Sequence, residues 1–224
     1  MKKKILFIGL LTALSFLMHA CSANEEVYSC NPDADAWAKD NLKGIKEMSR
    51  EGWLRIEKPA YRKAAYAAFT ALQKQTFWIT KINEILALDW SVEERTHLLK
   101  LLSFITEKMD IFEKGMDDED EIWSYKWLKY GEDVLKWDKD ILFNIAMNGD
   151  EVANVEETSF HQNITRLKTR TEHDESQGSD PTCNCRTDKN DCKSDQECRK
   201  ASVYYCNMTY CGFLYLYVCN GKCK

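Results

Sequence analysis

The chain has 224 residues, of which ten are cysteine and seven are tryptophan, and its formal net charge is −5. This length allows one ordinary domain and a smaller second unit. The charge is mildly acidic and no basic patch is interleaved with aromatic residues, so the composition argues against nucleic acid as a partner.

Residues 1–20 predict export. Three lysines at the start precede an almost wholly apolar stretch at 5–18, which is too short to span a membrane stably. Ala20 then precedes Cys21 in a loose bacterial lipobox formed by residues 18–21. We expect cleavage before Cys21 and its modification with fatty-acyl chains such as palmitate, which anchor a protein to a membrane without spanning it. Ordinary cleavage nearby, which would leave Cys21 as a thiol, is the alternative.

An acidic tether follows at residues 21–30. Glu25 and Glu26 come soon after the expected lipid cysteine, and acidic residues at this place resemble a bacterial signal for display on the outer cell surface. The expected location is therefore membrane-anchored outside the cytoplasm, on the outer membrane or cell surface, with the periplasmic face as the alternative.

The stretch 31–164 has the spacing of amphipathic helices. Pro32 and Pro59 suit the first turns of two helices, and a capping box from Ser91 to Glu94 starts a third. The acidic run at 117–121 starts a fourth helix, where negative charge opposes the helix dipole. We expect a break or a short extended piece at residues 52–56. The helices should end at Gly115 and at Asn148-Gly149 and form a compact bundle.

Eight cysteines lie in the last 42 residues. A segment this short cannot hold a fold by apolar burial alone, and disulfides persist outside the cytoplasm. None of the spacings is the CxxC that zinc sites favour, so we predict four disulfides and no metal, with the pairing left open. The eight are Cys183, Cys185, Cys192, Cys198, Cys206, Cys211, Cys219 and Cys223. Cys30 is left over, either as a free, buried thiol or as a partner of a tail cysteine.

The sequence from Gly212 to Val218 alternates aromatic and aliphatic residues, which is the periodicity of a strand. Phe213, Tyr215 and Tyr217 would then share one face. A module this small cannot bury both faces of the strand, so this aromatic face is a candidate contact face for the helical body, a partner or a membrane. Residues 201–205 are also prone to form a strand, and Asn220-Gly221 favours a type I′ turn.

The predicted fold class is α+β, with a mainly α-helical bundle followed by a small disulfide-rich β tail. Residues 21–182 carry 21 basic and 32 acidic residues, a balance of −11, whereas residues 183–224 carry seven and four, a balance of +3. The expected organisation is a signal peptide at 1–20, an acidic tether at 21–30, a helical domain at 31–164, a charged linker at 165–182 and a cysteine-rich module at 183–224.

The sequence holds no catalytic, nucleotide-binding or zinc-protease motif. We therefore predict no enzyme activity, no cofactor and no metal. His97 is expected at the surface or its boundary, and His161 and His173 in or near the linker. The acidic run at 117–121 lacks calcium-loop spacing. Three tryptophans with Tyr130 form a helical stripe, for which core packing is favoured over binding of a sugar or partner. They are Trp123, Trp127 and Trp137.

The tail is similar to that of a family called bacteriocin fulvocin C-related proteins. The likeness rests on the eight cysteines, on the start Cys183-Asn184-Cys185 and on the ending from Cys219-Asn220-Gly221 to Cys223. The segment around Cys30-Asn31-Pro32 and the helix from Tyr61-Arg62 through Trp78 also resemble the family's N-terminal half. Its members are predicted lipoproteins of Bacteroidetes, and fulvocin C is a short four-disulfide bacteriocin of similar length to the tail.

The resemblance implies a basic, disulfide-stapled module that acts as an antibacterial peptide on the envelopes of competitors. Two alternatives remain open. One is a membrane-anchored lipoprotein that binds a surface or protein target, or has a structural role, without toxicity. The other is self-immunity, in which the acidic body neutralises a basic toxin.

Overall fold

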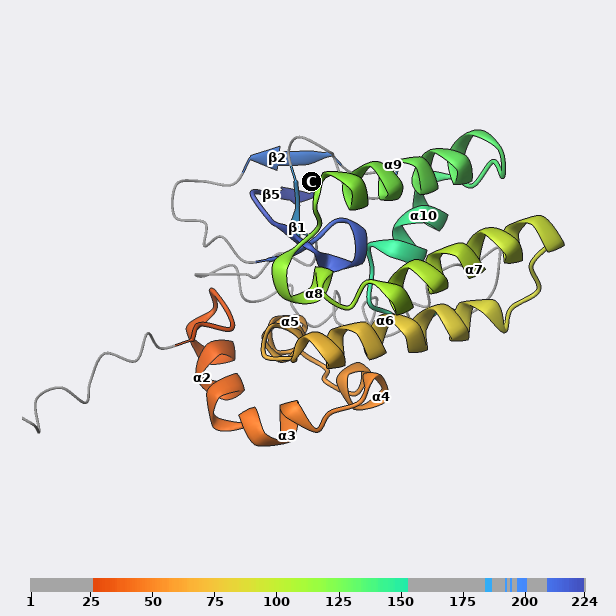
Figure 1. Ribbon diagram of the computed structural model, residues 1–224. Coiled ribbons are helices and arrows are strands. Elements are labelled where there is room, and N and C mark those ends of the chain that lie inside the picture. The colour runs from red at the N-terminus through yellow and green to blue at the C-terminus, as the bar shows by residue number, and fades with distance from the viewer. Residues whose placement is uncertain are drawn as a thin grey trace, which may run out of the picture.

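A computed structural model describes residues 26–152, 184–186, 192, 194, 197–200 and 209–223. The fold is α+β, with a helical body followed by a small strand-containing tail (Figure 1). The signal peptide, the linker and residues 201–205 lie outside the described residues. The helices are α2 (Pro32–Asp40), α3 (Leu42–Lys46), α4 (Arg50–Leu54), α5 (Pro59–Ala67), α6 (Ala71–Leu86), α7 (Val92–Glu107), α8 (Ile111–Lys114), α9 (Asp118–Asp133) and α10 (Lys139–Ala146).

The predicted helix starts are confirmed, because their signals are local. The side chain of Asn31 accepts a hydrogen bond from the backbone of Ala34, with Pro32 in the first turn of α2. The box of Ser91 and Glu94 caps α7 with both of its hydrogen bonds. Each cap satisfies backbone N–H groups that the first helical turn leaves without partners.

Several predicted helices are divided into two. The helix expected from Pro59 becomes α5 and α6, because Thr70 and Gln73 form a second capping box that starts α6. Residues 50–54 form the short helix α4, capped by Ser49, so the break expected at 52–56 begins only after Leu54. Between α9 and α10 the chain turns at Lys136, whose φ is 58°.

The tail forms two small antiparallel sheets. The strands are β1 (Asn184–Cys185), β2 (Cys198–Lys200), β3 (Thr209–Cys211), β4 (Tyr217–Val218) and β5 (Gly221–Cys223). Their orders are β1-β5-β2 and β3-β4, with Asn184 paired to Lys222 and Thr209 to Val218. Neither Asn220 nor Gly221 has a positive φ. The predicted type I′ turn is therefore wrong, and Cys219 and Asn220 connect β4 of one sheet to β5 of the other.

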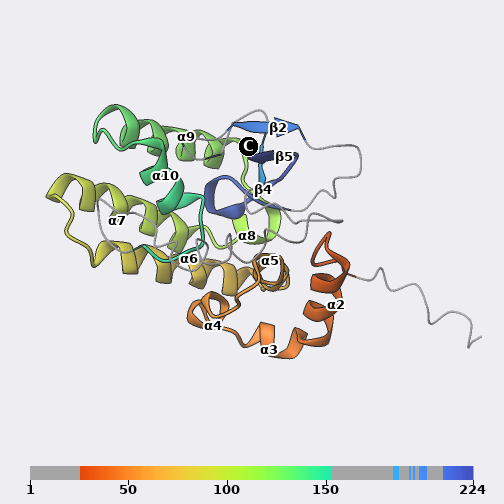
Figure 2. The ribbon, with the colours of Figure 1, turned by 180° about the vertical axis from the view of Figure 1, so that it is seen from behind.

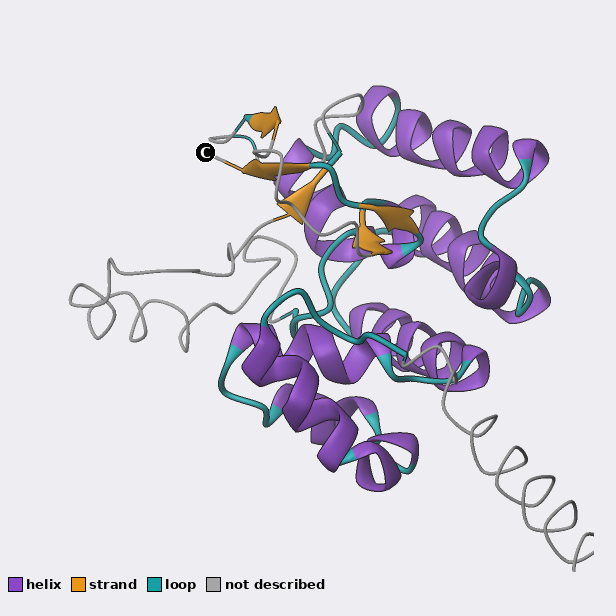
Figure 3. Ribbon diagram, turned by 90° about the vertical axis from the view of Figure 1, so that its left-hand side faces the viewer, coloured by secondary structure: helices purple, strands orange, loops and turns teal. Residues whose placement is uncertain are grey.

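The body and the tail share one apolar core. Trp78 and Ile82 of α6 are fully buried in it, and Phe213 and Leu214 of the tail belong to the same cluster. Figures 1 and 2 show the tail beside the start of α9 and near α8, and Figure 3 shows its strands against the helices. No helix in the described part of the chain is long and apolar enough to cross a membrane.

Candidate functional site

The segment from Gly212 to Tyr217 is a folded-back loop, which we call the finger. A 3₁₀ turn at Phe213–Tyr215 interrupts the predicted strand, so that prediction is wrong. The reason lies in the backbone: Gly212, Leu214 and Tyr215 have φ values of 63°, 52° and 58°. A ψ of −154° at Gly212 places that residue in a region that is essentially open to glycine alone.

A disulfide joins Cys211 to Cys219, with their Cα atoms 5.4 Å apart. The two cysteines bracket the finger, and β3, which ends at Cys211, pairs with β4, which ends just before Cys219. Both cysteines are buried. The cross-link and the short ladder together fix the base of the finger within the module itself, because a bridge over a short loop removes conformations from the unfolded chain.

The finger inserts Phe213 between two helices of the body. The rings of Phe104 on α7 and Trp123 on α9 are stacked 3.9 Å apart, and each centroid lies 6.4 Å from that of Phe213. Trp127, one turn further along α9, lies 6.0 Å from Phe213 in an edge-on arrangement. Phe213 is 2% exposed and Leu214 is fully buried. Edge-on aromatic pairs of this kind add to the free energy of burial.

A second aromatic group receives Tyr215 and Tyr210. The ring of Tyr66 on α5 lies 5.3 Å from Tyr215 and 5.4 Å from Tyr210, and Trp78 on α6 lies 5.3 Å from Tyr215. The hydroxyl of Tyr215 accepts a hydrogen bond of 2.7 Å from the backbone N–H of Gly149. Burial raises the pKa of the Tyr215 hydroxyl. We call the five body rings that contact Phe213, Tyr215 and Tyr210 the seat: Tyr66, Trp78, Phe104, Trp123 and Trp127.

The backbone at residues 148–150 is held by cations. Lys81 is fully buried, and its ammonium donates to the carbonyl of Asn144 at 2.6 Å and to that of Asn148. Burial places the pKa of Lys81 well below its usual value. Arg50 donates to the carbonyls of Gly149 and Asp150. These bonds fix the segment whose N–H at Gly149 meets the finger.

Two ion pairs complete this polar cluster. Arg62 donates to the carboxylate of Asp150 at 2.7 Å, and Arg50 lies 3.0 Å from the carboxylate of Glu84. Arg62 also lies over the ring of Trp53. Because the arginines and Lys81 are engaged by carbonyls and carboxylates, the cluster positions the backbone beside the seat.

His97 lies behind the seat and is 3% exposed, so its predicted place at the surface or boundary is wrong. Its ring is stacked 4.6 Å from that of Trp127 and 4.8 Å from that of Tyr130. Its Nδ1 atom is buried without a hydrogen-bond partner among the described residues. Burial lowers the pKa of His97, and the nearby Lys100 lowers it further. The uncharged ring therefore belongs to the folded structure at neutral pH.

The tail also touches the body at the start of α10. The backbone N–H and the hydroxyl of Ser194 donate to the two carboxylate oxygens of Asp140, at 2.8 and 2.7 Å. Within the tail, the guanidinium of Arg186 lies 4.1 Å from the ring centroid of Tyr217. Tyr217 is half-buried. The three aromatic residues that were predicted to share one face therefore have different contacts: Phe213 and Tyr215 pack against the body, whereas Tyr217 packs against Arg186 of the tail.

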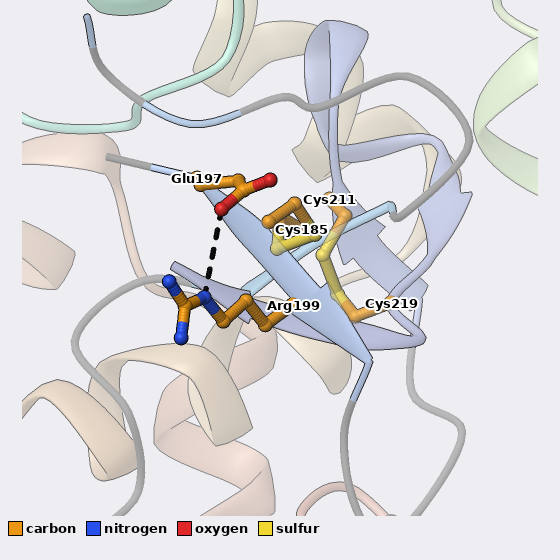
Figure 4. The surroundings of a disulfide bond; sticks show 6 residues. Cys185, Glu197, Arg199, Cys211 and Cys219 are labelled. Carbon is orange, nitrogen blue, oxygen red and sulfur yellow. Dashed lines mark ion pairs between the residues drawn. A yellow bond between two sulfur atoms is a disulfide. The ribbon is translucent and has the colours of Figure 1, made fainter. Parts of the chain in front are cut away.

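A second bridge joins Cys185 of β1 to Cys198 of β2. The predicted disulfides are thus confirmed for this pair and for Cys211 with Cys219. Figure 4 shows the surroundings of the bridges, with Arg199 of β2 turned toward Glu197 in an exposed ion pair of 3.5 Å. The sulfurs of Cys185, Cys192 and Cys198 lie within 4.8 Å of one another. All three are disulfide-bonded, so they lack the free thiolates that bind metal ions.

The remaining predicted residues divide into those described and those not. Cys30 is exposed and disulfide-bonded, which excludes a free, buried thiol. Trp127 and Trp137 are buried, so the packing interpretation of the tryptophan stripe is confirmed. In the acidic run, Asp117 caps α9 and Asp120 pairs with Lys108 at 2.9 Å. Outside the described part lie Cys21, Cys183, Cys206, His161, His173 and the side chain of Cys223.

Sequence reasoning missed Lys81, Arg50 and the seat. The one available signal was a lysine at an apolar position of α6, flanked by Trp78 and Ile82. A hollow of about 540 Å³ lies between α4 and α6, with Leu72 and Phe77 among its lining residues. It lies apart from the finger.

In the comparisons with known proteins, no family model, no curated protein and no solved structure matches this chain.

Proposed function

We propose that this chain is an exported, non-enzymatic lipoprotein, anchored through Cys21, whose helical body binds its own disulfide-stapled C-terminal module. The burial of the finger in the seat carries this proposal, because Phe213 and Leu214 are almost wholly removed from solvent by residues of the body. A module held in this way serves a binding or structural role at the envelope. Its resemblance to bacteriocin fulvocin C-related proteins agrees with the lipoprotein part of the proposal.

Mass spectrometry of the membrane fraction and of the culture medium of the native host tests this proposal. We expect one intact, lipid-modified species that begins at Cys21 and stays with the membranes. A free C-terminal fragment in the medium, with its disulfides intact, would contradict the anchored function.

A second candidate is antibacterial action by the module. It is favoured by the positive balance of residues 183–224 and by the similarity to a four-disulfide bacteriocin. In the intact chain Phe213 is buried against the seat, so action of this ring on a competitor's envelope requires the finger to leave the seat. The body would then keep the module latent.

Growth inhibition by purified protein tests this second candidate. The intact chain is compared with the module cut from it, at a protease site inserted within residues 165–182 of a Cys30→Ser variant, and separated from the body without reductant. Inhibition by the separated module that disappears on reduction of the disulfides supports the antibacterial function. Unchanged growth with the separated module would rule it out.

A further inference from the structure

The contact between finger and seat has two separately built halves. On the tail side, the bridge between Cys211 and Cys219 and the pairing of β3 with β4 lie entirely within the module. On the body side, all five rings of the seat come from residues 66–127, and the stacked pair of Phe104 and Trp123 is formed by the body alone. A binding partner that is already shaped loses less entropy on association than a flexible one.

The contact also carries hydrogen bonds that fix its orientation. Tyr215 accepts from the N–H of Gly149 at the bottom of the finger, and Ser194 donates twice to Asp140 at the edge of the module. The opposite charge balances of the two regions, −11 for residues 21–182 and +3 for residues 183–224, favour encounter between them. An aromatic anchor in a pocket with polar contacts around it is the arrangement that dominates many protein interfaces.

We infer that the seat on one copy also binds the finger of a module from a second copy. The partner is thus a disulfide-stapled peptide that presents the Gly212–Tyr217 loop. This inference rests on the proposed function, since it names a further ligand for the same seat. Lipid-anchored copies would then capture free modules at the envelope, and capture would neutralise a module of the antibacterial kind.

Because the module is attached to the body, each seat binds the module of its own chain more readily than the module of a second copy. Tethering gives the second binding event an effective concentration on the order of millimolar for a short flexible connection. Cutting the connection removes this advantage, and modules from different copies then compete equally for each seat.

Exchange between isotopically light and heavy proteins measures this competition. Both proteins are the full chain with a protease site inserted within residues 165–182 and with Cys30→Ser, so that no bridge through Cys30 holds the fragment. They are cut after folding, mixed without reductant and followed by native mass spectrometry. We expect the fragments to stay paired after cutting. Both kinds of hybrid, light body with heavy module and heavy body with light module, should appear and together approach half of the population of an equal mixture.

Two variants show whether the finger carries the binding. Phe213→Ser should shorten the time for which the cut module stays bound by about a hundredfold or more, as expected for loss of a large buried ring. Val218→Ser changes a residue of the same module that is 46% exposed, and should leave this time unchanged. If Phe213→Ser fails to fold, the exchange of the unsubstituted pair still decides the question.

Immediate separation of the fragments on cutting would overturn the inference, and so would stable pairs that form no hybrids. These outcomes are independent of where the protein is located. If the fragments exchange but the protein is found free in the medium, the anchored function is contradicted and the inference about the seat is still supported.

Discussion

The side chain of His97 contacts the backbone of Trp127, and the side chain of Trp127 contacts the backbone of His97. The Nε2 atom of His97 lies 3.0 Å from the carbonyl oxygen of Trp127, and the indole N–H of Trp127 donates to the carbonyl of His97 at 3.1 Å. Their rings are stacked nearly parallel, at 7°. Because Trp127 also contacts Phe213, this pair links the packing of α7 against α9 to the seat of the finger.

The stability of the protein should fall in mild acid through His97. A carbonyl partner at Nε2 requires the hydrogen there, which leaves Nδ1 as the atom that gains a proton, and none of the residues that the structure describes offers an acceptor to this buried atom. The folded pKa of His97 is lowered below its usual 6.5, so the unfolded chain binds the proton more readily. The contribution is therefore fully present above about pH 6.5 and is lost as the pH falls toward the folded pKa.

Urea unfolding at a series of pH values from 7.5 to 4.5 measures this effect. His97→Gln keeps a side chain that can donate to the carbonyl of Trp127 but cannot titrate. The difference in free energy of unfolding between wild type and variant should shrink as the pH falls. The same comparison also cancels the contribution of Glu94, whose carboxylate accepts a hydrogen bond from Trp137 beside the ring and whose pKa is lowered by its hydrogen bonds. A difference that stays constant with pH would contradict this assignment.

Replacement of Lys81 by methionine should weaken the protein even though it removes a buried charge. The carbonyls of Asn144 and Asn148 would lose their donor in a buried place, and an unsatisfied buried acceptor costs about 1–3 kcal/mol. Lys126→Met, on the exposed side of α9, is the control and should change stability by less than about 0.5 kcal/mol. Unfolding by urea compares the two, and an unchanged or more stable Lys81→Met variant would show that the carbonyls find other partners.

The helix starts of this protein were predictable, and the cluster around Lys81 was not. The caps at Asn31 and Ser91 involve residues three positions apart, so a short window of sequence contains the whole interaction. Lys81 meets a carbonyl 63 residues away. The partner of Lys81 depends on how α6 and α10 pack together, and no local sequence pattern predicts that packing.

The finger shows a second reason why local sequence patterns fail to predict structure. The alternation of aromatic and aliphatic residues from Gly212 to Val218 is a sound signal for a strand. It was overridden by the bridge between Cys211 and Cys219, whose pairing the spacing leaves open among 105 possibilities, and by the space between α7 and α9 that Phe213 fills. The sequence predicted that these aromatic residues need a covering surface, and the body was one of the three surfaces considered.

Loss of the bridge between Cys211 and Cys219 should disturb the packing of the finger in the seat more than loss of the bridge between Cys185 and Cys198. Replacing both Cys211 and Cys219 by serine removes a cross-link over eight residues, which is worth about 2–3 kcal/mol in the chain-entropy model. We also expect a change in tryptophan fluorescence, because Phe213 packs against Trp123 and Trp127. The matched control replaces Cys185 and Cys198, whose bridge spans 13 residues. It should lower stability by a similar amount with a smaller change in fluorescence, and equal changes in both would argue against a special role of the finger.

Two glycines provide the sharpest test of how closely the backbone beside the seat is packed. A Cβ atom added at Gly149 would lie 2.8 Å from the ring of Trp53 and 3.1 Å from that of Phe77. Neither ring can give way easily in a filled core, so Gly149→Ala should cost about 1–3 kcal/mol. Gly44, in the short helix α3, has nothing within 4 Å of the added atom, and Gly44→Ala should stabilise the helix by about 0.5–1 kcal/mol. Thermal unfolding should therefore move in opposite directions for the same chemical change. A loss of stability at Gly149 that also speeds release of the cut module would show that residues 148–150 hold the finger in its seat, whereas a loss without faster release would confine their role to the body.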